Sequence, residues 1–288
     1  MATSIRSRLG ELSPDQRVGL AERLRQNAQR RSSAWFVKHA DDERPVRLFC
    51  FPYAGSGASV FHTWPALLPD YVQLCALQLP GRETRLTENP YRQLRALVSD
   101  LGDEIIPLLD RPFAFFGHSM GALVAFELAR QLGDHDVLQP SRLFLSAFRA
   151  PQLPNPNIKI FHLPDEVLKT VLAKEGMPRG LLDSDEVMAA LLPALRADLE
   201  VCDTYKYAPQ APLSIPISMY GGLQDVRVGR ADLAAWGDET SASFDLTMLP
   251  GPHLFLQSAQ EQLVASIARK LGPPADRPRA TAISSLHE

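Results

Sequence analysis

The chain has 288 residues, of which 45% are hydrophobic and 22% are charged, and its formal net charge is -3. This length suits one α/β domain with appendages, and the composition excludes a disordered, collagen-like or coiled-coil protein. Because the charges nearly balance, nothing attracts the whole chain to nucleic acid or to an anionic membrane, and we expect neither as a partner.

The sequence also indicates a compartment. The N-terminal stretch has no apolar core of a secretion signal, and no run approaches the roughly 18 apolar residues that span a bilayer, so we expect a cytoplasmic protein. Cys50, Cys75 and Cys202 are widely spaced within apolar runs, which predicts reduced thiols in the interior. We expect no metal site and no bound cofactor.

The two ends of the chain differ from the middle. Residues 1–44 predict a helical extension and a linker, because Ser13-Pro14-Asp15-Gln16 has the pattern of a helix start. Residues 31–44 read as a polar link around the apolar pair Trp35-Phe36. At the other end, several prolines among polar residues predict a disordered tail over 273–288.

Between these ends, over residues 45–272, short β-branched or aromatic runs alternate with helical patterns. Such alternation predicts an α/β fold with a mainly parallel sheet and helices on both faces. The expected strands are Val46–Phe51, Val72–Leu77, Phe113–Phe116, Arg142–Ser146, Ile217–Tyr220 and Phe244–Met248. The expected helices are Val60–Leu67, Tyr91–Leu109, Met120–Leu132, part of Gln224–Trp236, and Ala259–Leu271.

A leucine-rich helical stretch from about residue 152 to 212 interrupts the alternation. An insertion there predicts a lid over the carboxyl edge of the sheet, where open α/β sheets bind ligands. Its apolar side chains suit either the lid's own core or an acyl pocket. They are Leu168, Leu172, Leu181, Leu182, Met188, Leu191, Leu192 and Leu195.

The segment Gly117-His118-Ser119-Met120-Gly121 matches G-x-S-x-G between a predicted strand and a predicted helix. A strand, a sharp turn and a helix in this order expose a serine hydroxyl for nucleophilic attack, and the flanking glycines let the backbone segments approach closely. We therefore predict that Ser119 is a nucleophile; the alternative is a structural glycine-rich turn.

A serine hydroxyl needs a base and an orienting acid, in the chain order serine, acid, histidine. The histidines downstream are His135, His162, His253 and His287, and the carboxylates considered are Asp203, Asp225, Asp232, Asp238 and Asp245. Only His253 among these histidines follows a predicted strand directly, and Asp225 likewise follows the strand ISMY and two glycines. We predict His253 as the general base and Asp225 as the acid that orients it.

An oxyanion hole requires two amide N–H groups, one of them from the residue after the nucleophile. Met120 supplies that one, and the loop after the first strand, Pro52-Tyr53-Ala54-Gly55-Ser56-Gly57, offers Ala54 first and Tyr53 second. The same loop lacks the third glycine of a dinucleotide-binding turn, so we expect no nucleotide there.

Taken together, the stretches LFCFPYAGSGAS, LPGRETR, FFGHSMGALVAFELAR, LPALRADLEVCDTY and LPGPHLFL resemble the discrete type II thioesterases of polyketide synthases and nonribosomal peptide synthetases. The resemblance covers about residues 45–272. It implies an α/β-hydrolase with a helical lid that removes acyl groups from the phosphopantetheine arm of acyl or peptidyl carrier proteins, which frees stalled modules. It assigns Ser119, Asp225 and His253 to the catalytic triad, and Met120 and Ala54 to the oxyanion hole.

One feature of the sequence distinguishes discrete thioesterases from those fused to synthases, and two features depart from the family pattern. The strand after the nucleophile helix reads LFLSAFRAP and carries no carboxylate, so the acid comes from the later strand, as in the discrete enzymes. Pro252 stands where the family commonly has glycine, and the first roughly 40 residues exceed the usual start of the family. This extension fits either a docking element or the remnant of a linker between fused domains.

Other functions remain open from the sequence. The same fold and motifs suit a small-molecule esterase, an acyltransferase, a product-releasing thioesterase or a binding module without activity. Because carrier proteins are acidic, a basic rim at the pocket mouth would aid their recruitment, and the candidates are Arg149, Arg179 and Arg196. We expect the protein to be a monomer.

Overall fold

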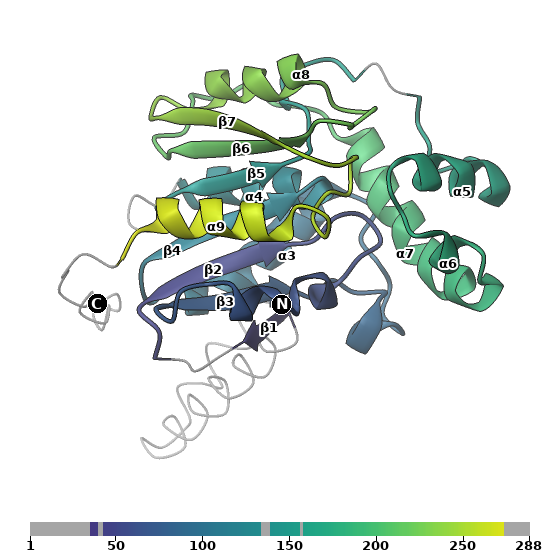
Figure 1. The fold of residues 1–288 in the computed structure, drawn as a ribbon, viewed down its shortest axis with the longest axis horizontal. Coiled ribbons are helices and arrows are strands. Elements are labelled where there is room, and N and C mark those ends of the chain that lie inside the picture. Colours follow the sequence, from purple (N-terminus) through teal and green to yellow (C-terminus); the bar gives the residue numbers. More distant parts are fainter. Residues whose placement is uncertain (1–34, 40–42, 134–138, 156–157, 274–288) are drawn as a thin grey trace, which may run out of the picture.

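The computed structural model describes residues 35–39, 43–133, 139–155 and 158–273 (Figure 1). The helix expected near Ser13 and residues 274–288 of the expected tail lie outside these described residues.

A seven-stranded sheet in the order β1-β3-β2-β4-β5-β6-β7 forms the centre of the molecule (Figure 1). All neighbouring pairs are parallel except β1 with β3. The strands are β1 Phe36–His39, β2 Val46–Phe51, β3 Val72–Leu77, β4 Phe113–His118, β5 Leu143–Ser146, β6 Ile217–Gly222 and β7 Phe244–Leu249. The six strands expected from the sequence are present and differ only at their ends, which confirms the predicted mainly parallel α/β fold.

Strand β1 differs from the polar link expected over residues 31–44. It pairs antiparallel with β3, with Phe36 opposite Leu77. Phe36 is buried and its ring meets that of Phe49 edge-on at 5.2 Å between centroids. Lys38, two residues on, is exposed at the edge of the sheet. Four residues with one inward aromatic make too short an alternation to distinguish from a loop in the sequence.

Helices cover both faces of the sheet. One face packs against α3 Leu94–Ile105, α4 Met120–Gly133 and α8 Arg230–Ala234. The other face packs against α9 Gln260–Leu271 and the 3₁₀ turns η1 Ala58–Phe61 and η2 Trp64–Ala66. The remaining 3₁₀ turns are η3 Glu83–Arg85, η4 Ile106–Leu108 and η5 Ala235–Glu239.

Prolines explain where the expected helices are too long. The single helix expected over Val60–Leu67 is replaced by η1 and η2, because Pro65 has no N–H to continue an α-helical ladder. Likewise, the helix expected to reach Leu109 ends at Ile105, and Pro107 lies in the 3₁₀ turn that follows.

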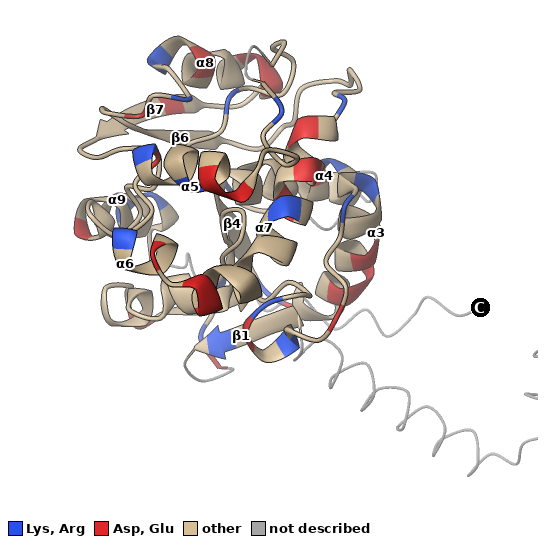
Figure 2. Ribbon diagram, turned by 90° about the vertical axis from the view of Figure 1, so that its right-hand side faces the viewer, with Lys and Arg blue, Asp and Glu red and all other residues tan. Residues whose placement is uncertain are grey.

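Three helices, α5 Asp165–Lys174, α6 Arg179–Leu182 and α7 Asp185–Thr204, lie within the insertion expected over residues 152–212. They stand beyond one end of the sheet (Figure 1). Acidic and basic residues are interspersed on the face that they present (Figure 2). The insertion has a core of its own, composed of Ile160, Leu168, Leu172, Met177, Leu182, Met188, Leu195 and Leu199.

Candidate active site

The turn between β4 and α4 holds Ser119 in a strained conformation. Its φ is 54°, which non-glycine residues rarely adopt, and its N–H donates to the Ser146 carbonyl at 2.8 Å. A Cβ on Gly117 would collide with the backbone of Gly121, and a Cβ on Gly121 would collide with the Phe51 carbonyl. Both glycines of the motif are therefore required by close backbone contacts, and the structural reason matches the one expected from the sequence.

Ser119, His253 and Asp225 form one hydrogen-bonded row. The Ser119 Oγ lies 2.9 Å from His253 Nε2, and His253 Nδ1 lies 2.8 Å from Asp225 Oδ2. The side chains of His253 and Asp225 are 5% and 1% exposed. Because a carboxylate only accepts hydrogen bonds, it favours the tautomer in which Nδ1 carries the proton and Nε2 accepts from the serine.

The loop after β6 holds the Asp225 carboxylate with two backbone donors. Its Oδ1 accepts from the N–H of Arg227 at 2.8 Å and from that of Val228 at 3.1 Å. Burial alone would raise the pKa of Asp225, but the hydrogen bond and charge interaction with His253, together with these two amides, lower it overall. The carboxyl group is therefore ionised near neutral pH.

A second histidine, His118, supports the loop that carries His253. Its Nε2 lies 3.0 Å from the backbone carbonyl oxygen of His253, and its Nδ1 lies 2.9 Å from Ser146 Oγ. Burial, followed by the neighbouring His253, lowers the pKa of His118 to about 3. The ring is therefore neutral, donates from Nε2 to the carbonyl, and accepts the Ser146 hydroxyl at Nδ1.

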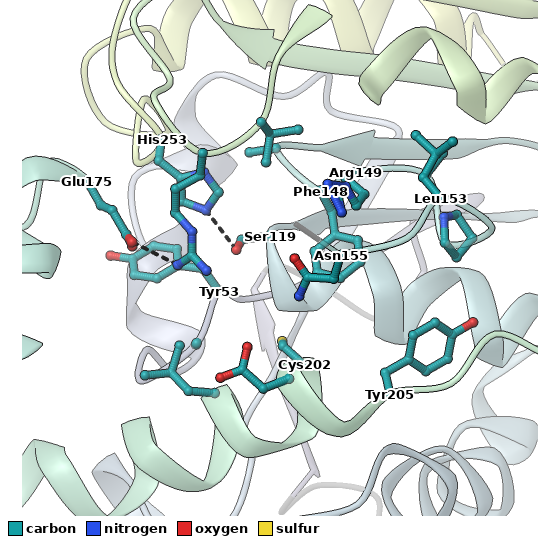
Figure 3. A pocket seen from close by; sticks show the side chains of 18 of the residues that line it. Tyr53, Ser119, Phe148, Arg149, Leu153, Asn155, Glu175, Cys202, Tyr205 and His253 are labelled. Atoms are coloured by element: carbon teal, nitrogen blue, oxygen red, sulfur yellow. Dashed lines mark hydrogen bonds and ion pairs between the residues drawn. The ribbon is translucent and has the colours of Figure 1, made fainter. Parts of the chain in front are cut away.

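A cavity of about 410 Å³ opens beside Ser119, between the carboxyl end of the sheet and the insertion (Figure 3). Apolar side chains of the insertion line it, namely Leu172, Met177, Leu195 and Leu199, whereas Tyr205 lies across the pocket from His253 (Figure 3). Of the apolar residues expected to line a pocket, only Leu172 and Leu195 do so. Leu168, Leu182 and Met188 are buried in the core of the insertion, Leu191 and Leu192 pack against it, and Leu181 is 43% exposed.

The two expected oxyanion donors lie next to the serine in different elements. Met120 is the first residue of α4, so its N–H has no partner within the helix. Ala54 and Tyr53, from the loop after β2, line the cavity together with Ser119. In that loop the Ser56 N–H donates to the Tyr53 carbonyl at 3.1 Å, which closes a tight turn over Ala54 and Gly55.

Sequence reasoning missed two ion pairs beside the site. Arg227 donates to Glu175 at 2.8 Å, and both residues line the cavity onto which Ser119 opens. Arg82 and Asp198 form a pair of which both members are nearly inaccessible. A signal existed for Asp198, because it occupies the buried stripe of α7, four residues after Ala194, where an apolar side chain is usual.

Two of the three cysteines are buried, as the sequence predicts, and Cys202 is only partly buried. Cys50 and Cys75 are fully buried, and Cys202 lines the cavity. Burial first, and the Asp198 carboxylate second, raise the pKa of the Cys202 thiol. The thiol therefore stays protonated and is a poor nucleophile. Within the described part of the chain, no group of three or more His, Cys, Asp or Glu side chains is arranged to hold a metal ion.

Two of the three arginines expected at a basic rim have partners within the chain. Arg149 donates to the Pro154 carbonyl. Arg196 donates to the carbonyls of Phe161 and Leu163 and pairs with Asp165, which fastens α7 to the segment before α5. Arg179 is exposed at the start of α6, whereas Arg149 is among the residues that line the cavity.

Comparisons with known proteins agree with this geometry. A family model described as a thioesterase domain matches residues 46–271. The chain is 44% identical over 233 residues to "Linear gramicidin dehydrogenase LgrE" of Brevibacillus parabrevis, covering 80% of this chain and 89% of that protein. The name of that relative includes the term dehydrogenase. In this chain, however, the loop after β2 reads Gly55-Ser56-Gly57-Ala58 and lacks the third glycine of a dinucleotide-binding turn.

Solved structures give the same result. One is the RedJ thioesterase from the prodiginine biosynthetic pathway of Streptomyces coelicolor, which is 35% identical with a TM-score of 0.75 and covers 79% of this chain and 91% of that one. Another is the type II thioesterase BorB from the borrelidin biosynthetic cluster, which is 30% identical with a TM-score of 0.74 and covers 83% and 96% of the two chains. No helix among the described residues is both long enough and apolar enough to cross a membrane.

Proposed function

The chain belongs to the thioesterase family of α/β-hydrolases, and from that premise we propose that it releases acyl groups from the phosphopantetheine arms of acyl or peptidyl carrier proteins, with Ser119 as the nucleophile. Its reaction is thioester hydrolysis. The observation that carries the proposal is the row of Ser119, His253 and Asp225 opening onto a cavity of about 410 Å³.

In the acylation step, the Ser119 Oγ attacks the thioester carbonyl carbon while His253 Nε2 accepts the hydroxyl proton. The amides of Met120 and Ala54 donate to the oxyanion that develops on the carbonyl oxygen. Asp225 keeps the imidazole oriented and stabilises its charged form. The carbon–sulfur bond then breaks, His253 returns the proton to the sulfur, and the phosphopantetheine thiol leaves.

In the deacylation step, His253 removes a proton from water, which attacks the acyl group on Ser119. The same amides stabilise the second oxyanion, the ester bond breaks, and Ser119 recovers its proton from His253. The products are a carboxylic acid and the free enzyme, so the carrier protein regains its thiol. These steps use only side chains, backbone amides and water.

The mechanism favours thioesters over amides because a thiolate is a good leaving group. It can depart before His253 has fully protonated the sulfur, whereas an amine cannot leave without its proton. The cavity also limits the acyl group to one that fills a partly apolar space between Leu172 and Leu199. The relatives named for gramicidin, prodiginine and borrelidin support a role in similar pathways. There the enzyme would edit stalled or wrongly primed modules, as a cytoplasmic monomer.

The proposal is tested by a hydrolysis screen over acyl thioesters of increasing length, presented both on pantetheine and on a carrier protein. Ser119→Ala is expected to lose turnover by about 10⁴-fold or more. Equal turnover in Ser119→Ala would overturn the assignment. Faster turnover of p-nitrophenyl esters, or transfer of the acyl group to an added amine or alcohol in place of water, would favour an esterase or an acyltransferase.

A further inference from the structure

An ion pair buried between the insertion and the body of the hydrolase domain lies directly behind the oxyanion loop. Arg82, which follows β3, and Asp198, on α7, are 5% and 3% exposed. Arg82 Nη2 donates to Asp198 Oδ1 at 2.9 Å, and its Nη1 pairs with Oδ2. This bidentate contact holds the Asp198 carboxylate in one orientation.

Both members of the pair also bind the backbone of the oxyanion loop. Asp198 Oδ2 accepts from the Gly55 N–H at 2.7 Å, and Arg82 Nη1 donates to the Ser56 carbonyl at 3.2 Å. The Ala54–Gly55 and Ser56–Gly57 peptide groups are thereby fixed from outside the loop. None of the partners that fix Asp225 or His253 takes part in these contacts.

The Gly55 contact selects one conformation of the turn. Tyr53 to Ser56 form a turn closed by a backbone hydrogen bond, and Gly55 has a φ of 78°, as in the third position of a type II turn. Turns of type I and type II differ by a flip of the central peptide group. That flip would place the Ala54 carbonyl oxygen where the Gly55 N–H now faces Asp198, so the carboxylate disfavours it.

From these contacts we propose that Asp198 is a positioning residue for the oxyanion hole: it holds the Ala54–Gly55 peptide in one orientation and so fixes the turn that presents the Ala54 N–H to the developing oxyanion. Arg82 holds the carboxylate in place. The inference rests on the proposed function and adds to it, because it makes helix α7 of the insertion a part of the catalytic apparatus as well as a wall of the cavity.

A purely structural role would be to fasten α7 to the domain, and another pair on the same helix separates the two roles. Glu200 on α7 binds Arg92 at 2.6 Å, but their side chains are 26% and 60% exposed. Glu200→Gln therefore removes an ion pair between α7 and the domain without touching the oxyanion loop. It is the matched control and is expected to leave kcat and KM unchanged.

The test uses two variants. Asp198→Ala removes the acceptor of the Gly55 N–H but leaves the Arg82 charge buried without its partner, which is expected to destabilise the folded state. The double variant Arg82→Met with Asp198→Leu removes both charges at similar volume, a replacement that proteins often tolerate. Thermal unfolding and circular dichroism establish that each variant is folded before kinetics are measured with an acyl-pantetheine thioester.

The expected result is a selective loss of transition-state stabilisation. Removing an oxyanion donor outright costs about 10²–10³-fold in kcat, so a misoriented donor is expected to cost about 10–100-fold, with KM changed less than about threefold. An acyl trifluoromethyl ketone, whose adduct with Ser119 carries the oxyanion, should bind more weakly by a similar factor. An unreactive thioether analogue should bind as it does to the wild-type enzyme.

Unchanged kcat in a folded variant would overturn the inference. Equal weakening of the binding of the ketone and of the thioether would also overturn it, because a general disturbance of the cavity lowers the affinity for both. The proposed function fails by a different result, namely a wild-type enzyme that neither hydrolyses the thioester nor forms the ketone adduct at Ser119.

Discussion

The two sides of the reacting carbonyl depend on the insertion in different ways. On the base side, Asp225 follows β6 and His118 ends β4, so the partners that hold His253 come from the sheet and the loops at its edge. The insertion contacts the neighbouring residues Arg227 and Leu254 through Glu175. On the oxyanion side, the loop after β2 is bound by Asp198, which comes from α7 of the insertion.

This difference separates what the hydrolase sheet supplies by itself from what the insertion adds. The sheet brings together a nucleophile, a base and an acid, whereas the insertion shapes the cavity and contacts the loop of the second oxyanion donor. We therefore expect changes on the base side to abolish proton transfer, and changes at the insertion to affect the stabilisation of charge or the choice of substrate.

The largest effect on the base side is expected for Asp225→Asn. The amide keeps the shape of the carboxylate but favours the wrong tautomer of His253 and no longer stabilises the imidazolium. We expect kcat to fall by about 10⁴-fold, as for the corresponding change in the serine protease triad. Steady-state kinetics with an acyl-pantetheine thioester measure it. Asp232→Asn, in the first turn of α8, is the control, and a fall of less than tenfold in Asp225→Asn would contradict the assigned role.

A second prediction concerns pH and the buried His118. The folded protein keeps this ring neutral down to about pH 3, whereas the unfolded chain binds a proton below about pH 6.5. Acid therefore favours unfolding, and between these two pH values the group lowers the free energy of unfolding by up to about 1.4 kcal/mol per pH unit. Below about pH 3 both states bind the proton, and His118 no longer changes the free energy of unfolding as the pH falls further.

His118→Gln tests this dependence, because glutamine can still donate to the His253 carbonyl but does not titrate. Urea unfolding at several pH values between 4 and 7 should show a shallower decline for the variant than for the wild-type protein. Groups common to both proteins cancel in this difference. Parallel curves would mean that His118 binds its proton over the same pH range in the folded and unfolded states, which would contradict the prediction.

The smallest effect is expected on the outer side of the insertion. Arg179 is exposed at the start of α6, away from the hydrogen-bonded row, so Arg179→Glu should leave hydrolysis of a pantetheine thioester unchanged. If it contributes to a basic rim, KM for the acidic carrier protein should rise a few-fold, more at low salt than at high salt. An equal change for both substrates would instead indicate a disturbed cavity.

How far the sequence predicts this molecule depends on how local each signal is. Strands such as Val46–Phe51 are continuous apolar runs, and the serine motif carries its own glycines, so both are recognisable from neighbouring residues. The order of residues along the chain, together with a position shortly after a predicted strand, then selects Asp225 and His253. Strand β1 was missed because its four residues gain their stability from β3 and Phe49, not from a pattern of their own.

The pair of Arg82 and Asp198 could not be predicted for a related reason. The two residues are 116 positions apart, and either one could face solvent on an isolated helix or turn. Only the docking of α7 onto the oxyanion loop brings them together. An aspartate within the apolar stripe of α7 indicates an inward-facing charge, but it does not identify the partner.

The central claim, that Ser119 carries the acyl group during turnover, is tested most directly by mass spectrometry of the enzyme quenched during hydrolysis of an acyl-carrier thioester. The account predicts a mass increase equal to the acyl group on the peptide that contains Ser119, absent in Ser119→Ala. An acyl group on the peptide that contains Cys202, or the same turnover with no acylated peptide under conditions in which deacylation limits the rate, would contradict it.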